Sequence, residues 1–123
     1  MEVVYTKNAP EAIGPYSQAI KAGDLVFTSG QIPIDPATGN IEAVTIEEQT
    51  EQVCKNISAV LQAAGTSLEK VVKTVCFLSD MDNFAAFNAV YSKYFTGKPA
   101  RSCVAVKTLP KNVLVEVDTV AEI

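Results

Sequence analysis

Arg101, Cys103 and Glu116 are the residues near the end of the chain whose side chains could take part in chemistry. The chain contains no histidine, so the commonest general base and the commonest metal ligand are both missing. Any reaction must therefore use carboxylates, arginine, hydroxyls, thiols, backbone groups and water. Cys103 has no histidine to activate its thiol, and a free cysteine is usually a small buried apolar side chain, so we expect only its backbone to take part.

Two strand patterns carry these residues. Residues 101–107 and 113–121 alternate valines with other side chains, and the short connection between them predicts an antiparallel hairpin. Successive side chains of a strand point to opposite faces, so the valines that face the helices leave the other residues on the opposite face. We therefore expect Arg101, Cys103 and Glu116 to project together from the sheet face that the helices do not cover.

That face also carries apolar Leu114 and Val120. Exposure to water alone explains such a mixture poorly, whereas a subunit interface that encloses a polar pocket accounts for both kinds of residue. We therefore expect the protein to be an oligomer.

The rest of the chain predicts the elements that must position these residues. Strand patterns occupy residues 2–6, 17–21, 25–29 and 71–78, and helical patterns occupy about 46–64 and 82–95. Thr45 and Glu48 have the spacing of a capping box, and Gly65 fits a left-handed cap at the end of the first helix. A glycine-containing connection at residues 22–24 indicates a hairpin, and we expect the strand at 71–78 to be buried on both faces.

Composition limits the classes of function. The 123 residues fit a single domain over residues 1–123, and the 14 acidic against 10 basic residues give a net charge of −4, which disfavours nucleic-acid binding. No apolar run is long enough for a membrane span or a signal peptide, so we expect a cytoplasmic protein. The three cysteines are odd in number and widely spaced, which indicates reduced thiols rather than a disulfide framework or a zinc site.

Three segments, read in order along the chain, resemble the signature segments of the RidA (YjgF, reactive intermediate deaminase) family. They are Ala12–Gln18, Thr28–Pro33, and Pro99–Val104 followed by Leu109–Lys111. Their order and spacing match along nearly the whole chain. The resemblance implies an α+β, chorismate-mutase-like fold, in which two helices pack on one face of a mixed sheet. It also implies a homotrimer with active sites at the subunit interfaces.

The resemblance further implies a 2-iminobutanoate and 2-iminopropanoate deaminase. Such an enzyme hydrolyses the enamine and imine products of pyridoxal-phosphate-dependent dehydratases to 2-keto acids and ammonia, without a metal or cofactor of its own. By the same resemblance, Arg101 holds the substrate carboxylate with help from the backbone N–H of Cys103. The Gly30 carbonyl accepts from the imine nitrogen, and Glu116 positions the attacking water and takes up its proton.

Tyr16, Ser29 and Asn88 complete the pocket wall on the same grounds, although each also has a purely structural interpretation. Asn88 lies on an apolar helix stripe, Tyr16 follows a Gly-Pro turn, and Ser29 ends a strand. Arg101 and Glu116 could likewise form only a structural salt bridge. A loop at residues 96–98 that is shorter than in several family members leaves substrate breadth open.

Two other functions remain open from the sequence. One is a ligand-binding or regulatory homologue that binds small 2-keto acids without turnover, because a fold does not fix a function. The other is action on RNA, which the acidic balance and the absence of histidine disfavour.

Overall fold

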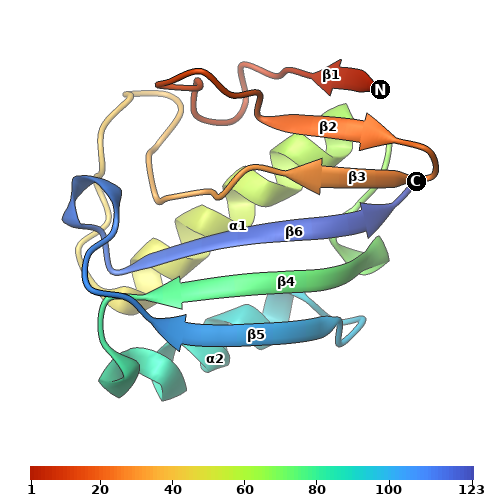
Figure 1. Ribbon diagram of the computed structural model, residues 1–123. Coiled ribbons are helices and arrows are strands. Elements are labelled where there is room, and N and C mark those ends of the chain that lie inside the picture. The colour runs from red at the N-terminus through yellow and green to blue at the C-terminus, as the bar shows by residue number, and fades with distance from the viewer.

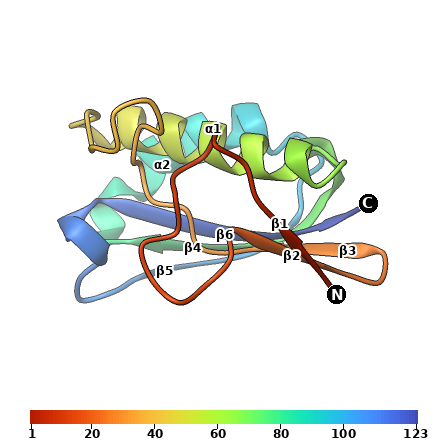
Figure 2. The ribbon, with the colours of Figure 1, turned by 90° about the horizontal axis from the view of Figure 1, so that it is seen from above.

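The computed structural model describes all residues 1–123. Its centre is a six-stranded mixed sheet with the strand order β1-β2-β3-β6-β4-β5, and both α-helices cover one face of that sheet (Figures 1 and 2). This arrangement confirms the predicted α+β class with two helices on one face. The strands are β1 (Glu2–Val4), β2 (Ala19–Ala22), β3 (Leu25–Thr28), β4 (Val71–Leu78), β5 (Ala100–Ala105) and β6 (Val115–Glu122), and the helices are α1 (Ile46–Ala63) and α2 (Phe84–Tyr94).

The hydrophobic core lies between the helices and the sheet. Val53 and Ile57 of α1 and Val115 and Val117 of β6 are completely buried there. Apolar residues at helical spacing on α1 thus meet the valines that alternate along β6, as the sequence predicted. No helix is both long and apolar enough to cross a membrane.

Local sequence signals fix the ends of α1. The Thr45 hydroxyl accepts the backbone N–H of Glu48 at 3.1 Å, and the Glu48 carboxylate accepts the backbone N–H of Thr45 at 3.1 Å. Gly65 follows the helix with φ of 86°. Both the capping box and the left-handed glycine are therefore confirmed.

The predicted hairpin near the start of the chain is also confirmed. Ala22 of β2 pairs with Leu25 of β3, so Gly23 and Asp24 alone make the turn.

The prediction that residues 71–78 are buried on both faces is wrong. The side chains of β4 that face the helices are buried, while those on the other face, such as Phe77, are only partly covered.

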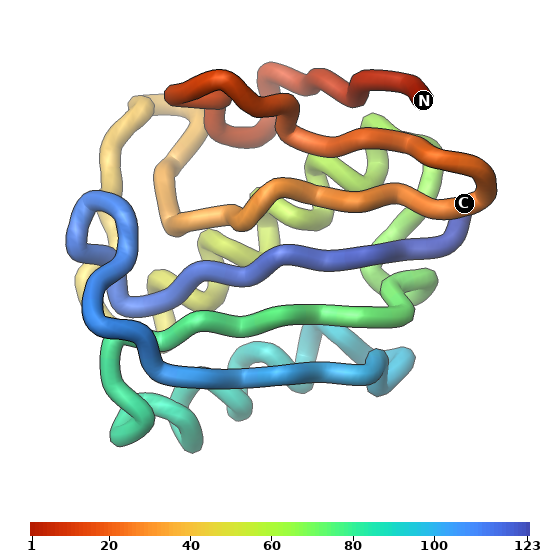
Figure 3. Tube along the Cα trace, viewed as in Figure 1, coloured from red at the N-terminus to blue at the C-terminus, as the bar shows by residue number.

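The predicted hairpin between residues 101–107 and 113–121 is wrong. β5 pairs in parallel with β4, and β4 separates it from β6 (Figure 1). The connection from β5 to β6 passes the end of β4 through the short 3-10 helix η3 (Pro110–Asn112), as the tube in Figure 3 shows. The alternation along each strand was read correctly, but alternation does not specify which strand is the neighbour.

This pairing also overturns the predicted common face of Arg101, Cys103 and Glu116. Paired residues of neighbouring strands point to the same side of a sheet, and Arg101 and Cys103 pair with the buried Thr74 and Cys76 of β4. Their side chains therefore face the helices. Glu116 pairs with Phe77 and faces away from the helices, as predicted.

Candidate active site

The guanidinium of Arg101 lies among aromatic side chains of α2. Its central carbon is 4.8 Å from the ring centroid of Tyr91 and 5.3 Å from that of Phe84, and Nη1 donates a hydrogen bond to Oδ1 of Asn88 at 2.7 Å. A cation at these distances is attracted to the electron-rich faces of aromatic rings. We call Arg101 with Asn88, Tyr91 and Phe84 the arginine half-site.

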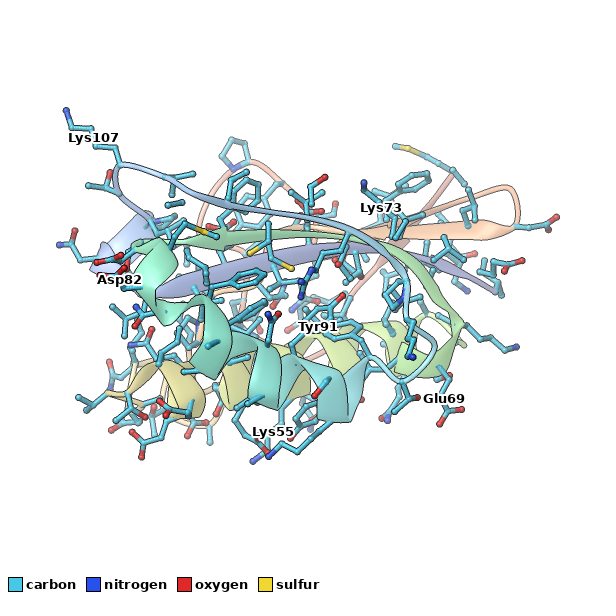
Figure 4. All side chains as sticks on the ribbon, turned by 90° about the horizontal axis from the view of Figure 1, so that it is seen from below. Lys55, Glu69, Lys73, Asp82, Tyr91 and Lys107 are labelled. Atoms are coloured by element: carbon cyan, nitrogen blue, oxygen red, sulfur yellow. The ribbon has the colours of Figure 1, made fainter.

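Contacts of Tyr91 fix α2 against the sheet, so that the aromatic rings of α2 lie beside the guanidinium of Arg101. The Tyr91 hydroxyl shares a buried hydrogen bond of 2.8 Å with Oγ1 of Thr74 on β4, and its ring stacks on Phe95 with centroids 4.4 Å apart. Figure 4 shows Tyr91 between the helical layer and the sheet. Tyr91 and Phe84 lie three and four residues from Asn88, so one face of α2 supplies all three side chains.

A cavity of about 360 Å³ opens beside Arg101, and Lys98 and Ser92 are among the residues that line it. No carboxylate lines this cavity, and the one ion pair in the chain joins Lys21 and Glu2 elsewhere. Apart from the bond to Asn88, the guanidinium makes no hydrogen bond within the chain. The arginine half-site can therefore bind an anionic group from outside the chain.

The backbone N–H of Cys103 lies at the free edge of the sheet. Val106 donates its backbone N–H to Leu78 of β4, and backbone groups alternate along a strand, so the N–H of Cys103 points away from β4. Burial raises the pKa of the Cys103 thiol despite the opposing charge of Arg101. The backbone, and not the thiol, is thus the group that Cys103 offers.

Glu116 lies on the opposite face of the sheet, against Gly30. A Cβ atom built on Gly30 would be only 2.0 Å from Oε2 of Glu116, so the carboxylate occupies the space that any other side chain would need. Burial, and in second place the negative charge of Asp118, raise the pKa of Glu116 above its ordinary value. A carboxylate with a raised pKa is a stronger base once it is ionised.

A second cavity, of about 320 Å³, lies beside Glu116 and Gly30, and Tyr16, Ser29 and Ile13 help to line it. The backbone carbonyl of Gly30 accepts no hydrogen bond from the rest of the chain. The Ser29 hydroxyl donates its proton to the Ser17 carbonyl at 2.5 Å, so toward a ligand it can only accept. We call Glu116, Gly30, Ser29 and Tyr16 the glutamate half-site.

The structure thus divides the predicted site residues into two groups. Arg101 and Asn88 line the first cavity, and Cys103 lies two residues further along β5 on the same face, while Tyr16, Ser29, Gly30 and Glu116 line the second cavity. The sheet lies between the two groups, so a salt bridge between Arg101 and Glu116 within one chain does not exist. Neither half-site holds both a cation and a base.

Sequence reasoning missed several functional neighbours. Phe84 and Tyr91 were not among the predicted site residues, although their spacing from Asn88 could have indicated that they lie on the same face of the helix. Asp118, which faces the same side of the sheet as Glu116, was not singled out. No three His, Cys, Asp or Glu side chains come together in a cluster that could hold a metal ion.

The fold and the two cavities define an α+β protein with half-sites on both sides of one mixed sheet. Residues 6–123 match the protein-family model described as Endoribonuclease L-PSP. The chain is 55% identical over 121 residues to a RutC family protein of Pyrococcus horikoshii, an alignment that covers 98% of this chain and 96% of that protein. The chain therefore belongs to the family that includes the YjgF, RidA and RutC proteins.

Solved structures of relatives have the same fold. YyfA of Yersinia pestis, a member of the Rid protein family, has a TM-score of 0.96 at 51% identity over 99% of this chain and 98% of that chain. TdcF of E. coli, solved with bound serine, has a TM-score of 0.95 at 39% identity over 100% of this chain and 99% of that chain.

Proposed function

We propose that the protein is a 2-imino acid deaminase whose active site forms between two copies of the chain in a homotrimer. The observation that carries the proposal is the division of the site. An arginine without an anionic partner opens onto one face, and a glutamate with a raised pKa, which lies against Gly30, opens onto the other. Only a second copy of the chain can bring Arg101 and Glu116 into one crevice.

The uncovered sheet face supports assembly. Phe27 of β3 and Val104 of β5 are 43% and 47% exposed on it, next to Val120 and Phe77. Apolar neighbours that remain open to water on several adjacent strands are typical of a protein–protein interface. The glutamate half-site lies on this same face, so assembly would place it at a subunit boundary.

The chemistry of a 2-imino acid matches the two half-sites. Arg101 and the N–H of Cys103 bind the carboxylate of the substrate, and Asn88 keeps the guanidinium fork oriented. The carbonyl of Gly30 from the partner subunit accepts the N–H of the imine, which favours the protonated, more electrophilic form. Glu116 of the partner subunit then faces the imine carbon, with room for a water molecule.

Hydrolysis requires one general base. Glu116 takes a proton from water as the new C–O bond forms, and passes it to the nitrogen of the resulting carbinolamine. The C–N bond then breaks, and the hydroxyl proton passes to the carboxylate as the keto group forms. The departing ammonia takes up this proton and leaves as ammonium, which restores the ionised Glu116. Orientation and one base of this kind typically contribute about 10²–10⁴-fold, which suffices for imines because they already hydrolyse in water.

The bound serine of TdcF supports this substrate class. Serine carries a carboxylate and an amino group on one carbon, as the carbinolamine does. By contrast, the name of the family model points to RNA cleavage, for which two half-sites with one arginine and one lysine among their lining residues offer few phosphate contacts. Direct RNA cleavage is therefore the weaker proposal.

A coupled assay tests the proposed activity. Threonine dehydratase supplies 2-iminobutanoate, semicarbazide traps it in competition, and 2-oxobutanoate formation is followed with and without the protein. The parent protein should suppress trapping. Arg101→Ala should lose about 100-fold in kcat/KM, as expected for the loss of charged hydrogen bonds worth about 1.5–3 kcal/mol each. Lys93→Ala, an exposed change on α2, serves as the matched control.

Chemical modification of Arg101 distinguishes turnover of a ligand from binding alone. Arg101 is the only arginine in the chain, so phenylglyoxal, an arginine reagent, reports on this side chain alone. Protection by 2-oxobutanoate without any acceleration of imine hydrolysis would favour the ligand-binding homologue. If neither protection nor hydrolysis is seen, a site for small 2-oxo or 2-imino acids is excluded.

A further inference from the structure

The buried side chain of Gln18 gathers the hydrogen bonds of the N-terminal segment. Gln18 is only 3% exposed. Its Oε1 accepts the backbone N–H of Thr6 at 2.8 Å, and its Nε2 donates to the carbonyls of Thr6 at 2.9 Å, Pro10 at 2.8 Å and, more weakly, Ala9 at 3.4 Å. The carboxamide is the only neutral side-chain group with both an acceptor and two donors, so it satisfies the backbone on both counts.

These bonds close the base of an exposed loop. Residues 11–16 are all exposed, and the loop that they form runs from Pro10 back to Gln18. Ile13 and Tyr16 of this loop line the glutamate half-site, where the Tyr16 hydroxyl accepts the backbone N–H of Ile13 at 3.2 Å. The loop contains no helix or strand, so its position depends on its two ends.

The backbone of Gln18 forms a hydrogen bond to the residue that follows β3. Its carbonyl accepts the backbone N–H of Ser29 at 2.9 Å, and the Ser29 hydroxyl donates to the neighbouring carbonyl of Ser17. Gly30 follows directly. One residue therefore joins the loop that carries Tyr16 to the segment that carries Gly30 and faces Glu116.

We propose that Gln18 is a positioning residue for the glutamate half-site, because its buried carboxamide fixes the loop carrying Ile13 and Tyr16 relative to Gly30 and Glu116. The inference rests on the proposed function. Gln18 touches no substrate in this account. It acts through Tyr16, because the hydrogen bonds of its carboxamide hold the start of the loop that carries Tyr16. Small misplacements of a positioned group can cost about 100-fold in rate.

The proposal predicts a selective loss of catalysis. In Gln18→Leu, which is similar in size but makes no hydrogen bond, kcat should fall about 10- to 100-fold. Protection of Arg101 from phenylglyoxal by 2-oxobutanoate should change less than about threefold, because we propose that Arg101 and the backbone N–H of Cys103 hold the carboxylate, and Gln18 makes no hydrogen bond to either residue. Hydrogen exchange should increase in residues 11–17.

Thr66→Val provides a matched control for lost buried hydrogen bonding. Thr66 is 8% exposed and its hydroxyl donates to the carbonyl of Glu122, at the end of β6 remote from Glu116. This variant should lose stability but keep kcat and the exchange of residues 11–17. Equal kcat values for Gln18→Leu and Thr66→Val would overturn the inference.

Gln18→Glu gives a second readout and covers the case in which Gln18→Leu does not fold. A carboxylate among carbonyl oxygens loses both donors, whereas its protonated form regains one. The activity of Gln18→Glu relative to the parent should therefore rise as the pH falls from 8 to 5. If the activity ratio of Gln18→Glu to the parent protein stays constant over this range, the N–H donors of the Gln18 carboxamide have no such role. A parent protein that hydrolyses no imine would instead refute the proposed function.

Discussion

At the scale of single residues, the contact between Gly30 and Glu116 is the tightest feature of the candidate site. Only glycine fits at position 30 because the Glu116 carboxylate occupies the space of a side chain. A Cβ atom on residue 30 would lie 2.0 Å from Oε2 and 2.9 Å from Cδ of Glu116. The missing side chain thus lets the base lie against Gly30, whose carbonyl we propose accepts from the imine.

Gly30→Ala should therefore displace the carboxylate and lower kcat/KM by about 100-fold, while the protein remains folded. The coupled imine assay measures the rate, and circular dichroism checks the fold. Gly14→Ala is the milder comparison, because its Cβ would meet the Tyr16 ring at an ordinary 3.4 Å. A Gly30→Ala protein within threefold of the parent would show that the contact has no catalytic role.

The pH dependence of the reaction should reflect the raised pKa of Glu116. The base must be ionised to accept a proton, so kcat/KM rises with pH through this pKa and levels off above it. Burial is the main cause of the shift, and the charge of Asp118 is the second. Asp118→Asn removes that charge and should move the acid limb of the profile to lower pH, whereas an unmoved limb would assign it to another group.

The raised pKa of Glu116 should also affect folding stability, which should fall with rising pH where the activity rises. A carboxyl whose pKa is higher in the folded than in the unfolded state stabilises the fold at low pH, and this contribution is lost as the pH rises through the folded pKa. Glu116→Gln should therefore melt at a higher temperature than the parent at pH 8 and at a similar temperature at pH 3. Thermal unfolding at both pH values measures the difference.

At the scale of elements, the position of Arg101 shows what the sequence could not predict. Both helices, the capping box at Thr45, and most strands follow from local spacing, and they were predicted correctly. The neighbour of β5 depends on contacts far apart in sequence, and a valine pattern fits a parallel partner as well as an antiparallel one. The aromatic face of α2 accepts the guanidinium, so a charged residue faces the helices where a valine was expected.

For the candidate site, the sequence predicted which residues contribute but not on which face of the sheet each one lies. Each of the three family segments contributes residues that line a cavity, such as Tyr16, Gly30 and Arg101, but the division of these residues between two faces follows from the register of β5 on β4. That register places Arg101 beside Thr74, and only the three-dimensional structure reveals it.

Tyr91 links α2 to β4 and can be tested separately from the arginine that it supports. Tyr91→Phe removes the 2.8 Å hydrogen bond to Thr74 but keeps the ring beneath Arg101. It should lower the free energy of unfolding by about 1–3 kcal/mol, because a buried hydroxyl loses its partner, and change kcat/KM less than threefold. Urea denaturation and the coupled assay measure the two effects, and a large loss of activity would mean that the hydroxyl itself reaches the substrate.

At the scale of the whole molecule, the proposed function makes activity depend on assembly, because the two half-sites lie on opposite faces of one chain. The arginine half-site lies on the helix side of the sheet, and the glutamate half-site lies on the open side together with exposed Phe27 and Val104. In a ring of three or more identical subunits, each interface joins two different surfaces of the chain, so each interface can contain one half-site of each kind.

Mixing two inactive variants tests this claim most directly. Arg101→Ala keeps an intact glutamate half-site, and Glu116→Gln keeps an intact arginine half-site. After the two proteins are unfolded and refolded together in equal amounts, random assembly should restore about a quarter of the parental activity, because a quarter of the interfaces combine the two intact halves. Activity no greater than that of the variants refolded separately would contradict an active site shared between subunits.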